Sequence, residues 1–302
     1  MPGGFLDRLL GRSAPPTPEV ADALAELERL LDSRASLAAP GRMLQEVLPK
    51  LFADPGEDRP PDLLAERAAA KLEGGIPLLR GESLKLDMDA FRRRWRIVCA
   101  AVQHHQNREA GKALELALEE GELEPVLLVG SVLSAKPDEI HFRADALGLD
   151  AGLTAALLGL VLLPSLTRIC SALSHLRSDV RWLRGYCPTC GSWPLLGEYR
   201  GLEQTRFLRC GLCAAEWEFP RLLCVFCGER DHRQLGYFSV EGEESRYRAT
   251  TCATCRGYVK MTATLVPLSP PALLVADVAT VHLDLAAADR GYSSPPVFAP
   301  ED

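Results

Sequence analysis

In the segment CPTCGSW, residues 187–193, Cys187 and Cys190 stand three positions apart. Three more C-x-x-C pairs follow before residue 256, and together the four pairs contain eight of the ten cysteines. A tight turn can direct the sulfurs of positions i and i+3 at one point, and a glycine after the second cysteine suits a left-handed backbone there. Gly191 and Gly228 stand at that position. We therefore interpret each pair as one knuckle of a metal site.

The spacing of the pairs predicts two metal sites in tandem. The first and second pairs are separated by 19 residues and the third and fourth by 24, whereas only 10 residues separate the second from the third. Two knuckles joined by a hairpin of this length form a zinc-ribbon or rubredoxin-like cage. Interleaved ligation of the two sites stays open as an alternative. The simplest ligand sets are Cys187, Cys190, Cys210 and Cys213 for site 1, and Cys224, Cys227, Cys252 and Cys255 for site 2.

Two other interpretations of the cysteines agree less well with the sequence. Structural disulfides require an oxidising compartment, and the first residues, MPGGFLDRLLGRSAPP, contain no apolar stretch long enough for a signal peptide. A thioredoxin-like dithiol uses a single C-x-x-C at a strand-to-helix turn. Four thiolates also occupy all four coordination positions of a tetrahedral metal ion, which leaves none for water or substrate. We therefore predict a protein that is not an enzyme, with two metal ions for which both zinc and iron are compatible.

Residues 1–183 differ in composition from residues 184–270. The first part repeats Leu, Ala, Glu and Arg at helical spacing, whereas the second has more Gly, aromatic and β-branched residues in short runs. We expect an α+β, multi-domain chain with an all-α helical domain over 1–183, followed by two tandem rubredoxin-like or zinc-ribbon-like β modules. The modules are predicted over 184–222 and 223–270, and a C-terminal segment, 271–302, is expected to pack back on them. Because about 40 residues bury too little apolar surface to fold alone, each metal would stabilise its module.

Local patterns predict the individual elements. Thr17-Pro18 is a typical helix start, and residues 272–288 could form a strand or a helix. The apolar run 151–163 is short for a membrane span, which needs about 20 residues, so a core helix ending at Pro164 is expected. The end, YSSPPVFAPED, is expected to be an extended arm. Further helices are predicted over 43–52, 62–72, 87–105, 109–120, 125–134 and 165–183, and strands in RFLRC, EWEFP, LGYFSV and SRYRATTC.

Charge and isolated polar residues indicate neither nucleic-acid binding nor catalysis. The net charge is −7 with a pI near 5.5, and residues 184–260 carry eleven basic and nine acidic side chains. The basic run 92–96 is expected to be the solvated face of a helix, and His104 and His105 are expected at the surface or as caps. His232, five residues after Cys227, could replace a ligand. Cys99 and Cys170 are expected to be buried as small hydrophobic residues.

The order of the four elements CPTCGSWP, CGLCAAEW, CVFCG and CATCRGYVK resembles one family, the formate dehydrogenase accessory protein FdhE. Trp217 and Tyr258 belong to these signatures, and the tail ADVATVHLDLAAADRGY fits as well. The resemblance covers residues 186–292 closely and the rest of the chain loosely. After Tyr292 the family often continues to an Asn-Pro-Phe-like segment, whereas this chain has SSPPVF, residues 293–298. A partner contact that this tail makes in the family is therefore not assigned to residues 293–298 of this chain.

This resemblance implies a cytoplasmic maturation factor with two rubredoxin-like iron sites, whose ligands map onto the eight cysteines named above. It implies, as partner, the catalytic subunit of a respiratory formate dehydrogenase, a molybdenum-dependent selenoenzyme recognised before export. We expect no enzymatic turnover, no nucleic acid and no membrane insertion, and a homodimer stays open. Two alternatives are kept: a redox-active iron protein that transfers an electron during client maturation, and a zinc-ribbon protein that binds nucleic acid.

Overall fold

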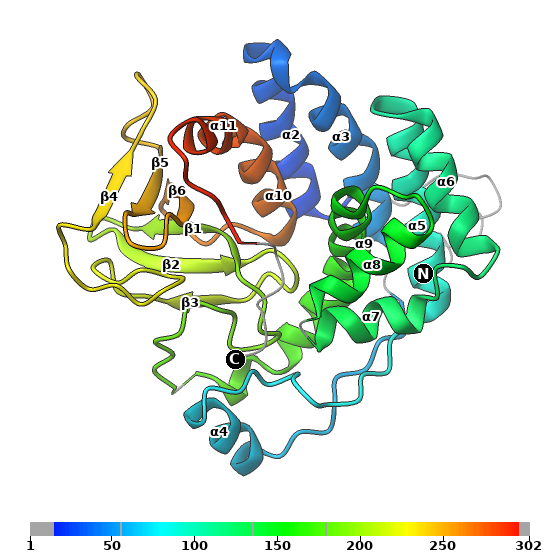
Figure 1. Ribbon diagram of the computed structural model, residues 1–302, viewed down its shortest axis with the longest axis horizontal. Helices are drawn as coiled ribbons and strands as arrows, with labels where there is room; N and C mark the ends of the chain where they lie inside the picture. The colour runs from blue at the N-terminus through cyan, green and yellow to red at the C-terminus, as the bar shows by residue number, and fades with distance from the viewer. Residues whose placement is uncertain (1–14, 55, 135, 179, 296–302) are drawn as a thin grey trace.

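The computed structural model describes residues 15–295 apart from residues 55, 135 and 179, so predictions made for residues 1–14 and 296–302 lie outside it. Within the described range, helices fill one side of the molecule and a six-stranded sheet fills the other. Two C-terminal helices lie between the sheet and the N-terminal helices (Figure 1). This arrangement confirms the predicted α+β, multi-domain class.

The helical half is built from helices whose apolar residues share one core. Asp87, Asn107 and Asp150 accept hydrogen bonds from backbone N–H groups in the first turns of three of these helices, and such caps determine where a helix begins. Thr17 occupies the predicted cap position of the first, but its side chain forms no capping hydrogen bond. The elements are α2 Pro18–Ser33, η1 Ala35–Leu37, α3 Ala38–Ala53, α4 Ala65–Glu73, α5 Met88–His105, α6 Arg108–Glu119, α7 Pro125–Leu133, α8 Pro137–Ala146, α9 Ala151–Ala172 and η2 Ser174–Leu176.

Helix α9 corrects the prediction that Pro164 ends a helix, because it continues through Pro164 to Ala172. A proline inside a helix costs about 3 kcal/mol, since it removes one N–H and its ring clashes with the preceding turn. Leu162, Leu163 and Leu166 around it are all buried, and each buried leucine contributes roughly 1.5–3 kcal/mol. Core packing therefore outweighs the cost of the proline. The predicted helix over 165–183 is wrong beyond Ala172, and α8 was not predicted.

Helix α9 is also long and apolar enough, by length and composition, to cross a membrane. It instead packs against α3, α5 and α8, and 61% of its most apolar stretch is buried inside the protein. Its composition is therefore explained by its place at the centre of the helical core.

The sheet joins both cysteine-containing parts of the chain. Strands β1 to β3 form one antiparallel meander and β4 to β6 form another, in the order β3-β2-β1-β6-β5-β4. The central strands β1 and β6 are parallel, with Gly197 opposite Met261. A Cβ at Gly197 would lie 2.6 Å from the end of the Met261 side chain and 3.0 Å from the Phe207 carbonyl oxygen, so a larger residue there would force the Met261 side chain to move. The bounds are β1 Pro194–Arg200, β2 Thr205–Cys210, β3 Glu216–Glu218, β4 Leu235–Phe238, β5 Tyr247–Cys252 and β6 Tyr258–Thr264.

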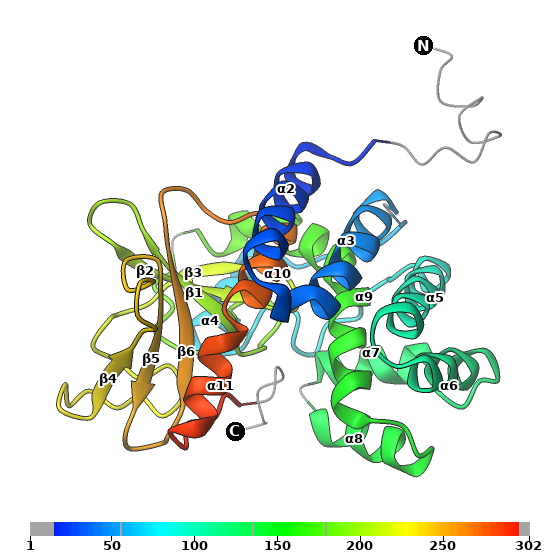
Figure 2. The same cartoon turned by 90° about the horizontal axis from the view of Figure 1, so that it is seen from above.

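Helices α10, Pro270–Ala279, and α11, Val281–Asp289, occupy the stretch left open between strand and helix. Helix α10 packs against α2 and α3, and α11 packs against β5 and β6 (Figure 2). Lys260 of β6 is buried and donates hydrogen bonds to Asp277 at 2.6 Å and to Asp284 at 2.7 Å. These two helices therefore connect the sheet to the helical half.

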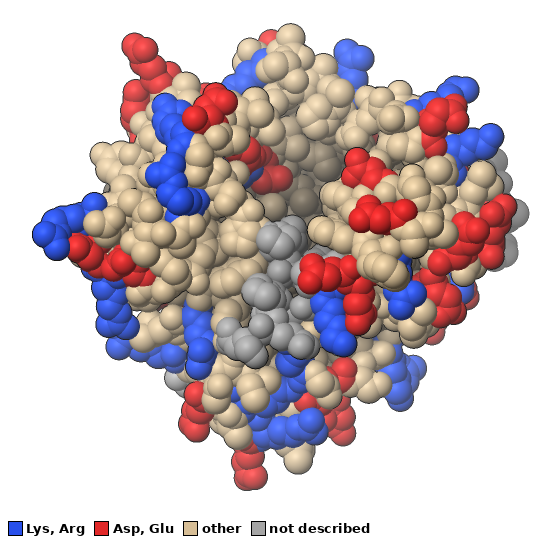
Figure 3. All heavy atoms as spheres, viewed as in Figure 1, with Lys and Arg blue, Asp and Glu red and all other residues tan. Residues whose placement is uncertain are grey.

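A single large cluster of buried apolar residues runs from α2 through α9 to the cysteines and the sheet. On the face in Figure 3, charged side chains of both signs lie around the rim, and uncharged residues occupy much of the rest. The described part of this face therefore carries no patch of uniform charge.

Candidate metal centres

The first four cysteines lie where the sheet meets the helical half. Cys187 and Cys190 precede β1, Cys210 ends β2, and Cys213 stands in the turn that follows. All four side chains are buried, and their sulfurs lie within 4.8 Å of one another. The Sγ–Sγ distances are 3.6 Å for Cys187–Cys213 and 3.4 Å for Cys190–Cys210. A tetrahedral ion with metal–sulfur bonds of about 2.3 Å separates its sulfurs by about 3.8 Å, so this group can hold a metal ion.

The second four cysteines form a similar group at the other half of the sheet. Cys224 and Cys227 precede β4, whereas Cys252 and Cys255 stand at the turn between β5 and β6. Their sulfurs also lie within 4.8 Å of one another, but Cys227 is exposed and Cys255 half-buried. The Sγ–Sγ distances are 3.6 Å for Cys224–Cys255 and 3.7 Å for Cys227–Cys252. The structure therefore groups neighbouring pairs and not interleaved ones.

Each of the four turns has a left-handed residue directly after its second cysteine. The φ angle is +88° at Gly191 and +72° at Gly228, and also +56° at Ala214 and +59° at Arg256. A left-handed conformation costs a residue with a side chain roughly 1–2 kcal/mol. The glycines indicated this geometry from the sequence, whereas Ala214 and Arg256 adopt it without that signal. The knuckle geometry is therefore imposed at all four turns.

Backbone N–H groups within the turns point at the first sulfur of a pair. The N–H groups of Thr189, Leu212 and Phe226 donate to the sulfurs of Cys187, Cys210 and Cys224, each at 3.4 Å. Hydrogen bonds to an ionised acceptor are stronger than neutral ones, and contacts outside the ligand shell orient the ligands. These turns are therefore built to stabilise thiolates.

The thiols of the first group differ in how readily they ionise. Burial opposes ionisation of Cys190, but hydrogen bonds from Cys187 and Cys210 hold its pKa well below the usual value. Burial raises the pKa of Cys210 and of Cys213 well above the usual value. Neighbouring negative charges disfavour one another in a buried site. Four thiolates can therefore coexist there only around a cation, which fits the donor set to a metal.

The second group shows the same contrast in a more open setting. Burial raises the pKa of Cys224. At Cys252 burial acts in the same direction, but N–H groups of Cys255 and Thr254 outweigh it and lower the pKa.

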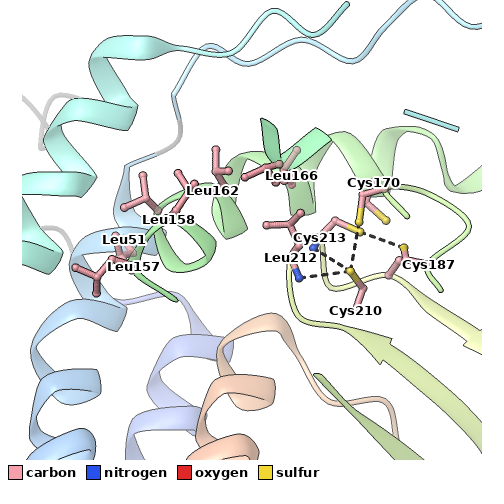
Figure 4. Packing of buried hydrophobic residues seen from close by; sticks show 14 of the residues in the cluster. Leu51, Leu157, Leu158, Leu162, Leu166, Cys170, Cys187, Cys210, Leu212 and Cys213 are labelled. Atoms are coloured by element: carbon pink, nitrogen blue, oxygen red, sulfur yellow. Dashed lines mark hydrogen bonds between the residues drawn. The ribbon is translucent and has the colours of Figure 1, made fainter. Parts of the chain in front are cut away.

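Helix α9 supports the first group directly. Figure 4 shows Leu158, Leu162 and Leu166 in a row on α9 that leads to Cys170, which lies beside the sulfurs of the first group. The Cys170 sulfur lies 3.6 Å from the Thr189 hydroxyl. It also accepts a hydrogen bond of 3.5 Å from Arg177. A hydrogen bond with Cys213 lowers the pKa of Cys170. Cys170 is buried as predicted, but the sequence did not indicate these polar contacts.

A cleft of about 700 Å³ is lined by Cys224 of the second group and by Gly191, which follows the first pair. Trp193, after the first pair, packs edge-on against Phe226, inside the third pair, with ring centroids 5.2 Å apart. Arg80, Arg184 and Arg230 line the same cleft, and none of its described lining residues is acidic. The cleft therefore combines an aromatic surface with positive charge beside both groups.

The remaining predicted candidates lie elsewhere. His104 and His105 both contact Glu46 of α3, and a hydrogen bond from Lys50, helped by His105, lowers the pKa of Glu46 to about 2. His232 has a side chain that is 77% exposed and is not part of the second group. In the basic run, Arg92, Arg93 and Arg96 are exposed as predicted. Arg94 departs from the prediction, because it is 1% exposed and donates to Ser165 at 2.7 Å.

Comparison with known proteins gives matches in sequence for the cysteine-containing part. Residues 186–221 match the family model described as FdhE, central domain, and residues 222–297 match FdhE, C-terminal domain. The FdhE homolog of Stutzerimonas stutzeri is 41% identical over 111 residues, which are 35% of this chain and 35% of that protein. The FdhE homolog of Aquifex aeolicus is 36% identical over 118 residues, 37% of this chain and 40% of that protein. These matches thus span well under half of the relatives' length.

A solved structure extends the similarity to the fold of both halves. The crystal structure of the FdhE protein from Pseudomonas aeruginosa matches with a TM-score of 0.62 at 26% identity. The match covers 95% of this chain and 98% of that one.

Proposed function

We propose, on a resemblance to the FdhE family that these matches confirm, that the chain is an accessory protein for formate dehydrogenase. It would bind the catalytic subunit in the cytoplasm and assist its assembly or activation before export, without catalysing a reaction itself. The observation that carries the proposal is the pair of four-cysteine groups, built within the residues that match the FdhE central and C-terminal domains.

The eight cysteines are the proposed metal ligands, four to each ion. Their sulfur spacing and the N–H groups directed at them suit a tetrahedral S4 ion. A bound zinc would cross-link the turns, whereas a bound iron would in addition offer one-electron redox chemistry. We favour iron from the family resemblance. In either case the chain supplies all four ligands, which leaves no position for a substrate and supports a binding role over catalysis.

The cleft between the two groups is the surface that we expect to contact the client. Its arginines and its aromatic side chains suit a partner segment that combines acidic and apolar residues, by charge and shape complementarity. Arg230 lies at this cleft, whereas Arg233 is also exposed on the same loop but pairs with Asp231 and does not line the cleft. The two residues therefore provide a matched pair of variants.

The test is co-purification with a formate dehydrogenase catalytic subunit in cells that produce both proteins. We expect the wild-type chain and Arg233→Glu to retain the subunit, and Arg230→Glu to recover several-fold less, because one charge reversal at an interface costs on the order of 1–3 kcal/mol. Metal content should be the same in all three. If the wild-type chain captures no subunit, the proposed function is wrong. If both variants capture it equally well, the cleft is not the contact surface, but the proposed function stands.

A redox role is the second candidate, and the exposure of Cys227 favours it, because electron exchange needs an accessible site. An iron-loaded chain should then show thiolate-to-iron charge-transfer absorption that reduction bleaches reversibly. A chain isolated without air that carries zinc alone would exclude this role.

A further inference from the structure

A small cavity behind the second cysteine group contains a buried arginine. The cavity measures about 190 Å³ and opens between the loop before β4 and the strands β4 to β6. None of its lining residues, all of which the structure describes, is an Asp or a Glu. Its polar lining includes Tyr199, Arg206, Arg221, Tyr237, Arg248 and Thr250.

Arg206 is 4% exposed and has no acidic partner among the described residues. Its Nη1 donates to the Pro220 and Leu223 carbonyls at 3.3 and 3.4 Å, and its Nη2 to the Thr250 hydroxyl at 3.4 Å. These distances exceed the usual 2.7–3.2 Å range. The buried Nε has no hydrogen-bond partner in the described chain. Since a guanidinium stays charged in proteins, a buried one without a counter-ion is costly.

Two further arginines stand at the mouth of the cavity. The guanidinium carbons of Arg221 and Arg248 each lie 5.3 Å from the centroid of the Tyr199 ring, and Arg248 also lies 5.4 Å from that of Tyr237. Neither arginine forms an ion pair with any described side chain, although Arg221 donates to the Glu203 carbonyl at 2.7 Å. Stacking on tyrosine rings holds both positive charges in place.

The volume limits what could enter. Pockets for drug-sized ligands measure about 300–1,000 Å³, so 190 Å³ is too small for a nucleotide or a large cofactor. Three arginines and no acid select for negative charge, and the planar forks of arginine suit carboxylate and phosphate oxygens.

The second cysteine group offers a competing explanation, because Cys224 and Cys252 also line the cavity. A loaded four-thiolate site is negatively charged and could itself neutralise Arg206. However, the hydrogen bonds of Arg206 go to carbonyl and hydroxyl oxygens, and within the described residues none goes to a sulfur. Within the described residues the charge of Arg206 therefore has neither an acidic nor a sulfur hydrogen-bond partner, and Arg221 and Arg248 donate to backbone carbonyls only.

We propose that this cavity binds a small oxyanion, a phosphate or a carboxylate group, with Arg206 at its base and Arg221 and Arg248 at its mouth. The inference does not depend on the role in formate dehydrogenase maturation.

The experiment is isothermal titration of the metal-loaded full chain with inorganic phosphate and, separately, with acetate, at ionic strength held constant with chloride. We expect saturable binding with one site per chain for at least one of them. Tighter phosphate binding would assign a phosphate-bearing ligand, and tighter acetate binding a carboxylate. Arg206→Met should weaken binding about tenfold or more, because it removes charge-assisted hydrogen bonds.

Because Arg206 is buried, Arg248→Gln at the mouth provides a second variant, and it should weaken binding several-fold with the fold intact. Arg290→Gln is the matched control, since Arg290 is exposed and stacks 4.7 Å from the Phe238 ring without lining the cavity; it should bind normally. The proposal is overturned if neither anion binds, or if Arg206→Met and Arg248→Gln both bind normally.

Discussion

The two cysteine groups have the same ligands and the same turns but different surroundings. The first is buried between the sheet and α9, with Cys170, Thr189 and Arg177 around it. The second lies at the outer half of the sheet, where Cys227 is exposed and Cys255 half-buried. The geometry of four cysteines is thus a local property, whereas access to them depends on what the rest of the chain packs against them. Four predictions test this contrast.

The largest effect is expected from removing one knuckle of each group. Replacing Cys187 and Cys190 by serine should unfold most of the chain, because a structural zinc contributes about 10–16 kcal/mol apparent, and this group belongs to the main core. Replacing Cys224 and Cys227 by serine should remove one metal ion per chain while the helical half stays folded. Elemental analysis and far-ultraviolet circular dichroism measure both. Equal loss of helical signal in the two variants would contradict the contrast.

The attachment of the outer half of the sheet can be tested at Lys260. Lys260→Met leaves Asp277 and Asp284 without their buried cation, and we expect a loss of about 3 kcal/mol in the free energy of unfolding. Denaturant unfolding measures this loss, with the exposed Lys136→Met as a control that should change stability by less than about 1 kcal/mol.

The same ion pairs predict a pH dependence. Burial opposes the charge on Lys260, but Asp277 and Asp284 outweigh it, so the pKa of Lys260 lies above the ordinary value of 10.5. The contribution of Lys260 is therefore complete below pH 10.5 and is lost as the pH rises above it.

Metal release should separate the two groups kinetically. With excess chelator we expect a fast phase from the second group and a phase at least about tenfold slower from the first, because a buried site must open before the chelator can reach it. Release is followed with a colorimetric indicator on the zinc-loaded chain. The variant lacking Cys224 and Cys227 should retain only the slow phase. A single phase with two equivalents of metal would show that burial does not control release.

The smallest effect is expected at Cys170. Cys170→Ala should cost about 1 kcal/mol in stability and leave two metal ions per chain, but should speed the slow phase several-fold, since the sulfur contacts the first group. Cys99→Ala is the matched control, because Cys99 is fully buried on α5 and burial raises its pKa to about 12. It should lose similar stability with the release rate unchanged. Loss of one metal ion from Cys170→Ala would contradict this prediction and would identify Cys170 as a ligand.

Local patterns in the sequence anticipated much of this structure. Helices α5 and α6 lie where the sequence predicts helices over 87–105 and 109–120, and the C-x-x-C spacing predicts the two groups in which the cysteines lie. Predictions failed where distant packing competes with a local preference. Helix α9 passes through Pro164, and Arg94 is buried beside Ser165, because the core around them compensates for both.

The amino-acid sequence alone predicts which cysteines lie together and where a helical part is followed by a sheet, because turn geometry and hydrophobic period act over a few neighbouring residues. Contacts between distant segments place β1 and β6 side by side in one sheet, bury the first group against α9, and leave Arg206 buried in a cavity whose described lining has no acidic residue. These features depend on contacts between residues far apart in the chain, such as Gly197 with Met261. Their free energy comes from burial and close packing, which no local pattern encodes.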